Sequence, residues 1–257
     1  MRAFRHALRL MTRLPIRGDG DPEPPWGELA AWFPAVGLTV GLLLAAGTGL
    51  WGRLAAPFPP LTGALMVTAW ALVTGGLHLD GWADCADAFF TPVSRERRLE
   101  IMADPRLGGF GAIGLILLLL VKSSAASYVA TEAMGAAGFW RQAEALWPLV
   151  VAPTAARAVL IAVAADPRMG WARPNGMGAR VREGFGRRQA LIAAITAGAV
   201  VLLGGWRGVA MLLAAYGAGA AWGWLAARRI GGLTGDVLGA IVELGETAAL
   251  LAVVLRV

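Results

Sequence analysis

The chain has 257 residues, of which 57% are hydrophobic and only 16% are charged, and its formal net charge is +6. Soluble domains carry about 25% charged residues, so this composition excludes an ordinary water-soluble protein and predicts an integral membrane protein. The basic residues are spread over separate loops, so the positive charge does not indicate nucleic-acid binding. The single cysteine, Cys85, excludes an internal disulfide.

The first 31 residues predict a surface segment and a linker. Arg2, Arg5, Arg9 and Arg13 recur at every third or fourth position, which places them on one helix face. They also interrupt any apolar core of a signal peptide. We expect an amphipathic helix on the cytoplasmic membrane surface, followed by a proline-rich linker to a transmembrane bundle at residues 32–257. Together the two parts form a single membrane domain of residues 1–257.

Seven apolar segments predict an all-α, polytopic transmembrane helical bundle, because a spanning helix needs about 20 mainly apolar residues. The first segment contains a GxxxG pair, Gly37 and Gly41. In a chain with 35 glycines we attribute this pair to chance. The small-residue helix faces permit homo-oligomers without requiring them. The expected spans lie near Trp32–Gly52, Leu61–Leu79, Phe110–Val129, Leu146–Ala165, Ala190–Gly205, Gly208–Ala226 and Val237–Leu255.

The basic residues predict the orientation of this bundle. Seventeen of the 23 Lys and Arg residues fall in the N-terminal segment and in every second loop after it, and four fall on the opposite side. Short cytoplasmic loops carry the excess of Lys and Arg. The N-terminus is therefore expected in the cytoplasm, and the C-terminus on the other side.

The segment GGLHLDGWADCADAFF, residues 75–90, carries the most informative polar residues. Asp80, Asp84 and Asp87 stand at positions i, i+4 and i+7, which is one face of a helix. Three carboxylates on one stripe repel each other unless a cation neutralises them, and oxygen ligands suit Mg²⁺. The sequence therefore predicts a magnesium site on the cytoplasmic side. His78, one turn earlier, is a candidate base or substrate-binding group.

A second acidic set occupies the last span. Asp236 and Glu243 share a helix face, and Glu246 lies beside them. An ionised carboxylate facing lipid is costly, so these groups must face a cavity, a cation or a basic partner. Two readings stay open for Glu243 and Glu246. They bind substrate together with Lys122 and Arg157, the two cations inside spans, or they only pair with those cations.

Two glycine-containing loops on the same predicted membrane side complete the candidate site. In ADPRLGGFGA, Asp104 and Arg106 precede three glycines and a span, and backbone amides at such a helix entrance can approach a phosphate. The loop WARPNGMGARVREGFGRR mixes arginine with glycine and suits an anionic nucleotide, with Arg173 as the candidate residue. Ordinary cytoplasmic loop charge is the alternative reading of the second loop.

These pieces together resemble one family, adenosylcobinamide-GDP ribazoletransferase, also called cobalamin synthase. The matching segments run in family order from Met11 to Glu246, over almost the whole chain. The aspartate ladder followed by the DPRLGGFG block is the most specific part of the resemblance. The other matching segments are MTRLPI, WFPAVGLTVG, RRLEIMADP, ARPNGMG and GDVLGAIVELGE.

The resemblance implies an Mg²⁺-dependent membrane transferase that joins adenosylcobinamide-GDP to α-ribazole or α-ribazole 5′-phosphate, with release of GMP. It also implies a bacterial inner membrane location with the active site facing the cytoplasm. Under this hypothesis Asp80, Asp84 and Asp87 hold Mg²⁺ on the diphosphate. Asp236 adds a ligand or accepts a proton, and Arg106 and Arg173 stabilise negative charge.

Other membrane proteins are weighed against this reading. A CDP-alcohol phosphotransferase would have an arginine soon after its first Asp-Gly, whereas Asp80-Gly81 is followed by Trp82. A prenyltransferase would need a second Asp-rich motif on a matching loop, for which Asp236, Glu243 and Glu246 are a poor substitute. A cation-coupled transporter would be expected to show repeated halves, and none is found in this sequence.

Overall fold

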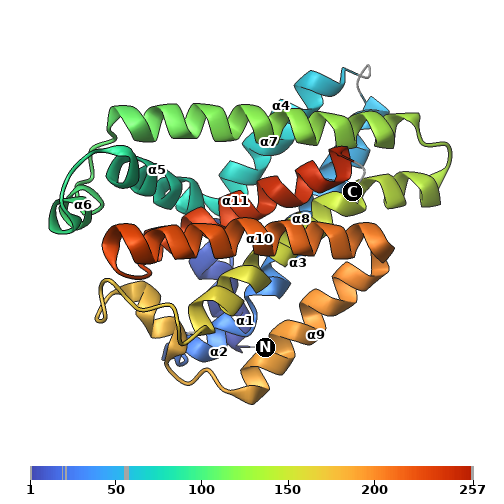
Figure 1. Cartoon of the computed structure of the whole chain (residues 1–257). Helices are drawn as coiled ribbons and strands as arrows, with labels where there is room; N and C mark the ends of the chain where they lie inside the picture. The colour runs from blue at the N-terminus through green and yellow to red at the C-terminus, as the bar shows by residue number, and fades with distance from the viewer. Residues whose placement is uncertain (1, 19, 21, 55–57, 256–257) are drawn as a thin grey trace.

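The structure is a computed structural model that describes residues 2–18, 20, 22–54 and 58–255. The described residues form helices and one isolated β-bridge, which confirms the all-α prediction (Figure 1). In chain order the elements are α1 (Arg2–Met11), α2 (Trp26–Ala30), α3 (Phe33–Leu54), α4 (Pro59–Thr74), α5 (Leu77–Phe90), α6 (Arg95–Ile101), α7 (Gly109–Gly135), α8 (Phe139–Ala165), the 3-10 turn η1 (Met177–Arg182), α9 (Arg187–Leu203), α10 (Gly205–Ile230) and α11 (Gly235–Val254).

Five segments of the described chain are long and apolar enough to cross a membrane. They are Trp26–Gly52, α7, α8, α10 and α11, and the bent pair α4–α5 makes up to six. The first begins at Trp26, earlier than the expected Trp32. The expected fifth span corresponds to α9, a separate helix of 17 residues that is not among the five. A multi-span bundle is thus confirmed, while the count of seven and the orientation stay predictions.

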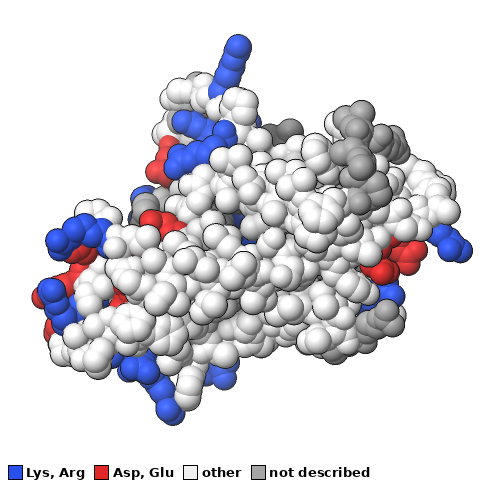
Figure 2. Space-filling view, turned by 90° about the horizontal axis from the view of Figure 1, so that it is seen from above, with Lys and Arg blue, Asp and Glu red and all other residues white. Residues whose placement is uncertain are grey.

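The charge distribution agrees with a bundle in lipid. Figure 2 shows a broad face without charged side chains, and the charged residues gather at its margins. Many large apolar side chains are exposed on the outer faces of the helices, including Leu72, Leu120 and Leu213. Such a surface would be unfavourable in water and is expected where helices contact acyl chains.

The predicted second span, Leu61–Leu79, is not one straight helix, because it is broken near its end. α4 stops at Thr74, and Gly75 and Gly76 follow with φ values of 67° and 70°. This left-handed conformation is strained for residues with a side chain and is accessible to glycine. The chain turns by 96° there, so Leu77–Leu79 belong to α5 rather than to α4. The aspartate ladder therefore runs nearly at right angles to α4.

The first span packs closely against α8 through the GxxxG pair, which contradicts our attribution of that pair to chance. A Cβ atom at Gly37 would collide with the carbonyl group of Pro153. At Gly41 it would lie 2.6 Å from the carbonyl oxygen of Leu149. Both contacts are far inside van der Waals distance, so only glycine allows α3 to approach α8 this closely.

Gly41→Leu is expected to lower the free energy of unfolding by about 2 kcal/mol or more, because overpacking forces the two helices apart. Gly47→Leu is the matched control, since Gly47 is exposed on the same helix and a Cβ there meets nothing within 4 Å. Thermal unfolding in detergent measures both variants. Equal melting temperatures for the two would contradict the close α3–α8 contact.

The N-terminal helix α1 is amphipathic, as expected, but its apolar face packs against the rest of the protein rather than lying on the membrane surface. Ala7, Leu8 and Met11 are buried, and the Phe4 ring lies 5.7 Å from the ring of Trp32. Because the bundle covers this face, α1 presents its arginine-bearing face outward. A contact between that face and lipid headgroups stays a prediction.

Candidate active site at the crossing of helices α5 and α11

The ladder helix α5 carries its three aspartates in graded environments. Asp80 is exposed, Asp84 is half-buried and Asp87 is buried. The C-terminal end of α5 is held by Arg98, whose Nη1 donates to the carbonyl oxygens of Ala88 and Phe89. Sequence reasoning counted Arg98 only as a loop charge. A basic residue shortly after a predicted helix end was the available signal for this capping role.

Helix α11 crosses α5 at Gly81, and this crossing assembles the site. A Cβ atom at Gly81 would lie 2.7 Å from the carbonyl oxygen of Asp236 and 3.0 Å from its Cα. The absence of a side chain therefore brings the start of α11 against the first turns of α5. The crossing joins two acidic groups that are far apart in the sequence, Asp80 and Asp84 on one helix and Asp236 on the other.

These carboxylates share one electrostatic environment. The charges of Asp236, Asp80 and Asp87 act on Asp84, and the positive charge of Arg173 opposes them. Asp236 is likewise subject to opposite influences, from the positive charge of Arg173 and from the negative charge of Asp80. The crossing at Gly81 thus places Asp80 and Asp84 on one helix near Asp236 on the other, and the charge of Arg173 acts on Asp84 and Asp236. This arrangement leaves more negative than positive charge at the crossing.

Asp236 is oriented by the start of its own helix. Thr234 caps α11 by accepting a hydrogen bond from the backbone N–H of Val237 at 3.2 Å. The Thr234 hydroxyl also donates to Oδ2 of Asp236 at 3.3 Å. A threonine cap before an acidic first turn is favourable at a helix N-terminus. Sequence reasoning did not identify Thr234, although a Thr preceding an apolar helix is a recognisable cap.

Asp87 differs from the other two ladder residues. Its Oδ2 accepts the backbone N–H of Gly108, and its Oδ1 accepts that of Gly111, both at 2.8 Å. These amides are at the entrance of α7, where the sequence predicted contact with a phosphate. The carboxylate of Asp87 occupies them instead and ties the glycine turn to α5. This arrangement favours a structural role for Asp87.

Asp104 and Arg106 form a pair on the loop before α7. Arg106 donates from Nε and Nη2 to the Asp104 carboxylate at 2.9 Å and 2.5 Å. The side-chain and backbone hydrogen bonds from Arg106 lower the pKa of Asp104 to about 2. Both residues line an open cavity of about 230 Å³ beside Asp87. They therefore border the site rather than join the carboxylates at the crossing.

The loop before η1 is fixed against the start of α11. A β-bridge joins Trp171 to Leu233, and Arg173 donates from Nη2 to the carbonyl oxygen of Leu99 at 2.5 Å. Arg182 donates to the carbonyl oxygens of Ala164 and Asp166 near the end of α8. Both loop arginines donate to backbone carbonyl groups, and of the two it is Arg173 whose charge also acts on Asp84 and Asp236.

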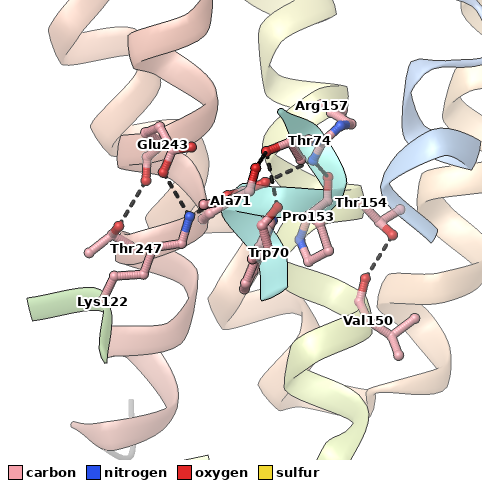
Figure 3. A network of polar contacts seen from close by, with 11 residues as sticks. Trp70, Ala71, Thr74, Lys122, Val150, Pro153, Thr154, Arg157, Glu243 and Thr247 are labelled. Carbon is pink, nitrogen blue, oxygen red and sulfur yellow. Dashed lines mark hydrogen bonds and ion pairs between the residues drawn. The ribbon is translucent and has the colours of Figure 1, made fainter. Parts of the chain in front are cut away.

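Four further candidates lie away from the crossing in a buried ion network (Figure 3). Lys122 donates to Glu243 at 2.7 Å and to Glu246 at 2.6 Å, and Arg157 donates to Glu246 at 2.8 Å. All four side chains are at most 4% exposed. The geometry favours the second of our two readings, in which the acids pair with the cations. His78 is also buried, within electrostatic reach of this network.

Known proteins provide an independent comparison. The sequence model of the family described as cobalamin-5-phosphate synthase matches residues 3–254. An adenosylcobinamide-GDP ribazoletransferase of Brevibacillus brevis is 34% identical and aligns with 99% of this chain and 98% of its own length. Enzymes of the same name from Pseudomonas syringae pv. syringae and Pseudomonas entomophila are 39% and 38% identical. They align with 99% and 100% of this chain and with all of their own lengths. No solved structure matches significantly.

Proposed function

We propose that this chain, which belongs to the cobalamin-5-phosphate synthase family, joins adenosylcobinamide-GDP to α-ribazole or α-ribazole 5′-phosphate. The products are GMP and adenosylcobalamin or its 5′-phosphate. The names of the relatives support this step in the assembly of the nucleotide loop of cobalamin. Within the structure, the observation that carries the proposal is the close crossing at Gly81, which packs α5, with Asp80 and Asp84, against the start of α11, with Asp236.

The residues at the crossing fit Mg²⁺. Among the described residues, no group of three or more His, Cys, Asp or Glu side chains forms a ready-made metal cage. Mg²⁺ rarely needs one, since it keeps several waters and binds through one or two carboxylates plus substrate phosphate oxygens. Asp80 is exposed and Asp84 half-buried, so both can reach such an ion. We assign these two carboxylates to Mg²⁺, and Asp87 to the glycine turn.

The chemistry is phosphoryl transfer to a ribose hydroxyl. The hydroxyl oxygen attacks the phosphorus attached to the corrinoid, the phosphoanhydride bond to GMP breaks, and GMP takes the bonding electron pair. Mg²⁺ supplies charge neutralisation on the diphosphate when bound. Asp236 accepts the proton of the attacking hydroxyl. Arg173 stabilises the negative charge that develops on the phosphoryl oxygens.

We further propose that the site faces the cytoplasm of a bacterial inner membrane. The distribution of arginines supports this orientation, because Arg173 and the α6 arginines belong to the predicted cytoplasmic loops. The lipid bilayer is the expected surrounding of the apolar helix faces. Homo-oligomers remain a prediction.

An assay on purified protein in detergent tests this function. The reaction contains adenosylcobinamide-GDP, Mg²⁺ and either α-ribazole or its 5′-phosphate, and chromatography follows GMP and the corrinoid product. We expect both products in equal amounts with Mg²⁺ and none with EDTA. Restoring Mg²⁺ in excess of the EDTA should restore the activity.

Two outcomes would contradict the proposal. Full activity in EDTA would exclude the metal role of Asp80 and Asp84. No turnover of folded protein with either acceptor would exclude the transfer reaction. The CDP-alcohol phosphotransferase, the prenyltransferase and the cation-coupled transporter would then be the readings to test.

A further inference from the structure

The buried ion network inside the bundle has a composition unlike that of a substrate site. We call Lys122, Arg157, Glu243 and Glu246 the ionic clasp. Its two cations and two anions balance, and three charged hydrogen bonds of 2.6–2.8 Å join them. The four side chains are at most 4% exposed, so a nucleotide or a corrinoid does not reach them, although Nε and Nη2 of Arg157 have no hydrogen-bond partner. The clasp therefore needs a role other than substrate binding.

The clasp joins two other helices to α11. Lys122 belongs to α7 and Arg157 to α8, and both acids belong to α11. The ring of Trp70, on α4, lies 4.2 Å from Nζ of Lys122. Contacts from several directions at Glu243 and Glu246 oppose both rotation of α11 about its axis and translation along it. A slip of one helical turn, about 5.4 Å, would break all three hydrogen bonds.

The same helix carries Asp236 in its first turn, N-terminal to the clasp. α11 runs without a break from Gly235 to Val254, so Asp236 and Glu243 move together. Seven residues of helix separate them by about 10 Å along the axis. The position of the clasp therefore sets the position of Asp236 relative to α5. His78 of α5 also lies within electrostatic reach of Arg157, Glu246 and Lys122, which connects the second helix of the site to the same network.

We propose that the ionic clasp is a positioning device that fixes the axial position of α11 and so places Asp236 opposite Asp80 and Asp84. The proposal rests on the proposed function for the role of Asp236. Buried ion pairs stabilise little compared with apolar residues of similar size, and their best-attested use is to fix register. A helix in a membrane bundle has many apolar faces of similar shape, and charged hydrogen bonds distinguish one register from the others.

A charge-balanced double variant tests the clasp. Lys122→Met with Glu243→Gln removes one cation and one anion and leaves the pair of Arg157 and Glu246 intact. We expect a folded protein whose kcat falls by about 10- to 100-fold, because an error near 1 Å at a reacting group has effects of this size. The KM for adenosylcobinamide-GDP should stay within about twofold of wild type, since the clasp does not contact substrate.

The conservative Lys122→Arg keeps the charge and should retain most of the activity. Thr154→Val is the matched control for loss of a buried hydrogen bond. Its hydroxyl donates to the carbonyl oxygen of Val150, outside the clasp. If the double variant does not fold, Glu243→Gln alone replaces it, because both cations then keep Glu246 as partner. Glu243→Gln alone should also lower kcat.

Coupling to Asp236 separates positioning from a general structural effect. In an Asp236→Asn background the group to be positioned is already lost. Adding Lys122→Met and Glu243→Gln to that background should therefore lower kcat by only about twofold more. The same fold-loss in both backgrounds would overturn the proposal. So would a wild-type kcat in the double variant.

A distance measurement tests the clasp without relying on activity. Spin labels at Phe90 of α5 and Leu255 after α11, both exposed, report the position of one helix relative to the other. They are introduced as Phe90→Cys and Leu255→Cys in a Cys85→Ala background. We expect a shifted or broadened distance distribution in the double variant, and an unchanged one would overturn the proposal. If wild type has no transferase activity, the proposed function fails, whereas this measurement still tests the clasp.

Discussion

Asp84→Asn is expected to lower the rate of transfer by about 100-fold or more, since a metal ion contributes several kcal/mol of charge stabilisation in such reactions. The charges of both Asp80 and Asp236 act on Asp84. The amide is similar in size but carries no charge, so it removes one proposed metal ligand while leaving the packing of α5 intact. Initial rates of GMP release, measured over a range of Mg²⁺ concentrations, give the effect.

Glu100→Gln is the matched control for the loss of one carboxylate. Glu100 is exposed on α6, where it pairs with Arg97 at the surface. This variant should keep the wild-type rate. Thermal unfolding of both proteins establishes that they are folded. A folded Asp84→Asn protein with the rate of the control would contradict the metal role of the ladder.

Gly81→Leu is expected to disrupt the site through the backbone. A side chain at this position would meet the carbonyl oxygen of Asp236 at 2.7 Å, so α5 and α11 must separate. We expect kcat to fall by about 100-fold, because Asp236 moves away from Asp80 and Asp84. The free energy of unfolding should fall by about 1–3 kcal/mol from overpacking.

Gly217→Leu is the control for this substitution. Gly217 is an exposed helical glycine of α10, and a Cβ there meets nothing within 4 Å. Its variant should keep both the rate and the melting temperature. Gly81→Ala, with a smaller side chain, should fall between Gly81→Leu and wild type. Equal rates for Gly81→Leu and Gly217→Leu would show that the crossing does not position Asp236.

The sequence predicted the fold class and both acidic sets because each has a strong local signal. Long apolar segments define a membrane bundle, and the spacing of Asp80, Asp84 and Asp87 defines one helix face. The meeting of that face with Asp236 has no local signal. It depends on Gly81, which among 35 glycines does not stand out. The close contacts at Gly37 and Gly41 were missed for the same reason.

The bend before α5 was missed because a hydropathy pattern contains no information about a change in the direction of the chain. Leu77 and Leu79 continue the apolar run of α4, so the sequence reads as one span through Leu79. The adjacent pair Gly75 and Gly76 was the only local sign of a turn. Its consequence, a change of direction of 96°, depends on the backbone conformation that these glycines adopt.

The sequence does not distinguish the roles of residues of the same type, because those roles depend on which groups from other helices lie next to each side chain. Asp87 and Asp84 are both ladder aspartates, yet Asp87 accepts two backbone amides and Asp84 faces other carboxylates. Glu243 and Glu246 could be read as ligands or as partners of Lys122 and Arg157. The choice depends on distances between helices, which a single sequence does not contain.

We propose that the α5 carboxylates of Asp80 and Asp84 hold one metal ion on the substrate diphosphate, and Mn²⁺ in place of Mg²⁺ tests this role. Electron–nuclear double resonance on purified protein with adenosylcobinamide-GDP detects phosphorus bound to Mn²⁺. We predict a phosphorus coupling in wild type, in the absence of acceptor, that is lost or strongly weakened in both Asp80→Asn and Asp84→Asn. Unchanged Mn²⁺ binding and phosphorus coupling in both folded variants would contradict the account.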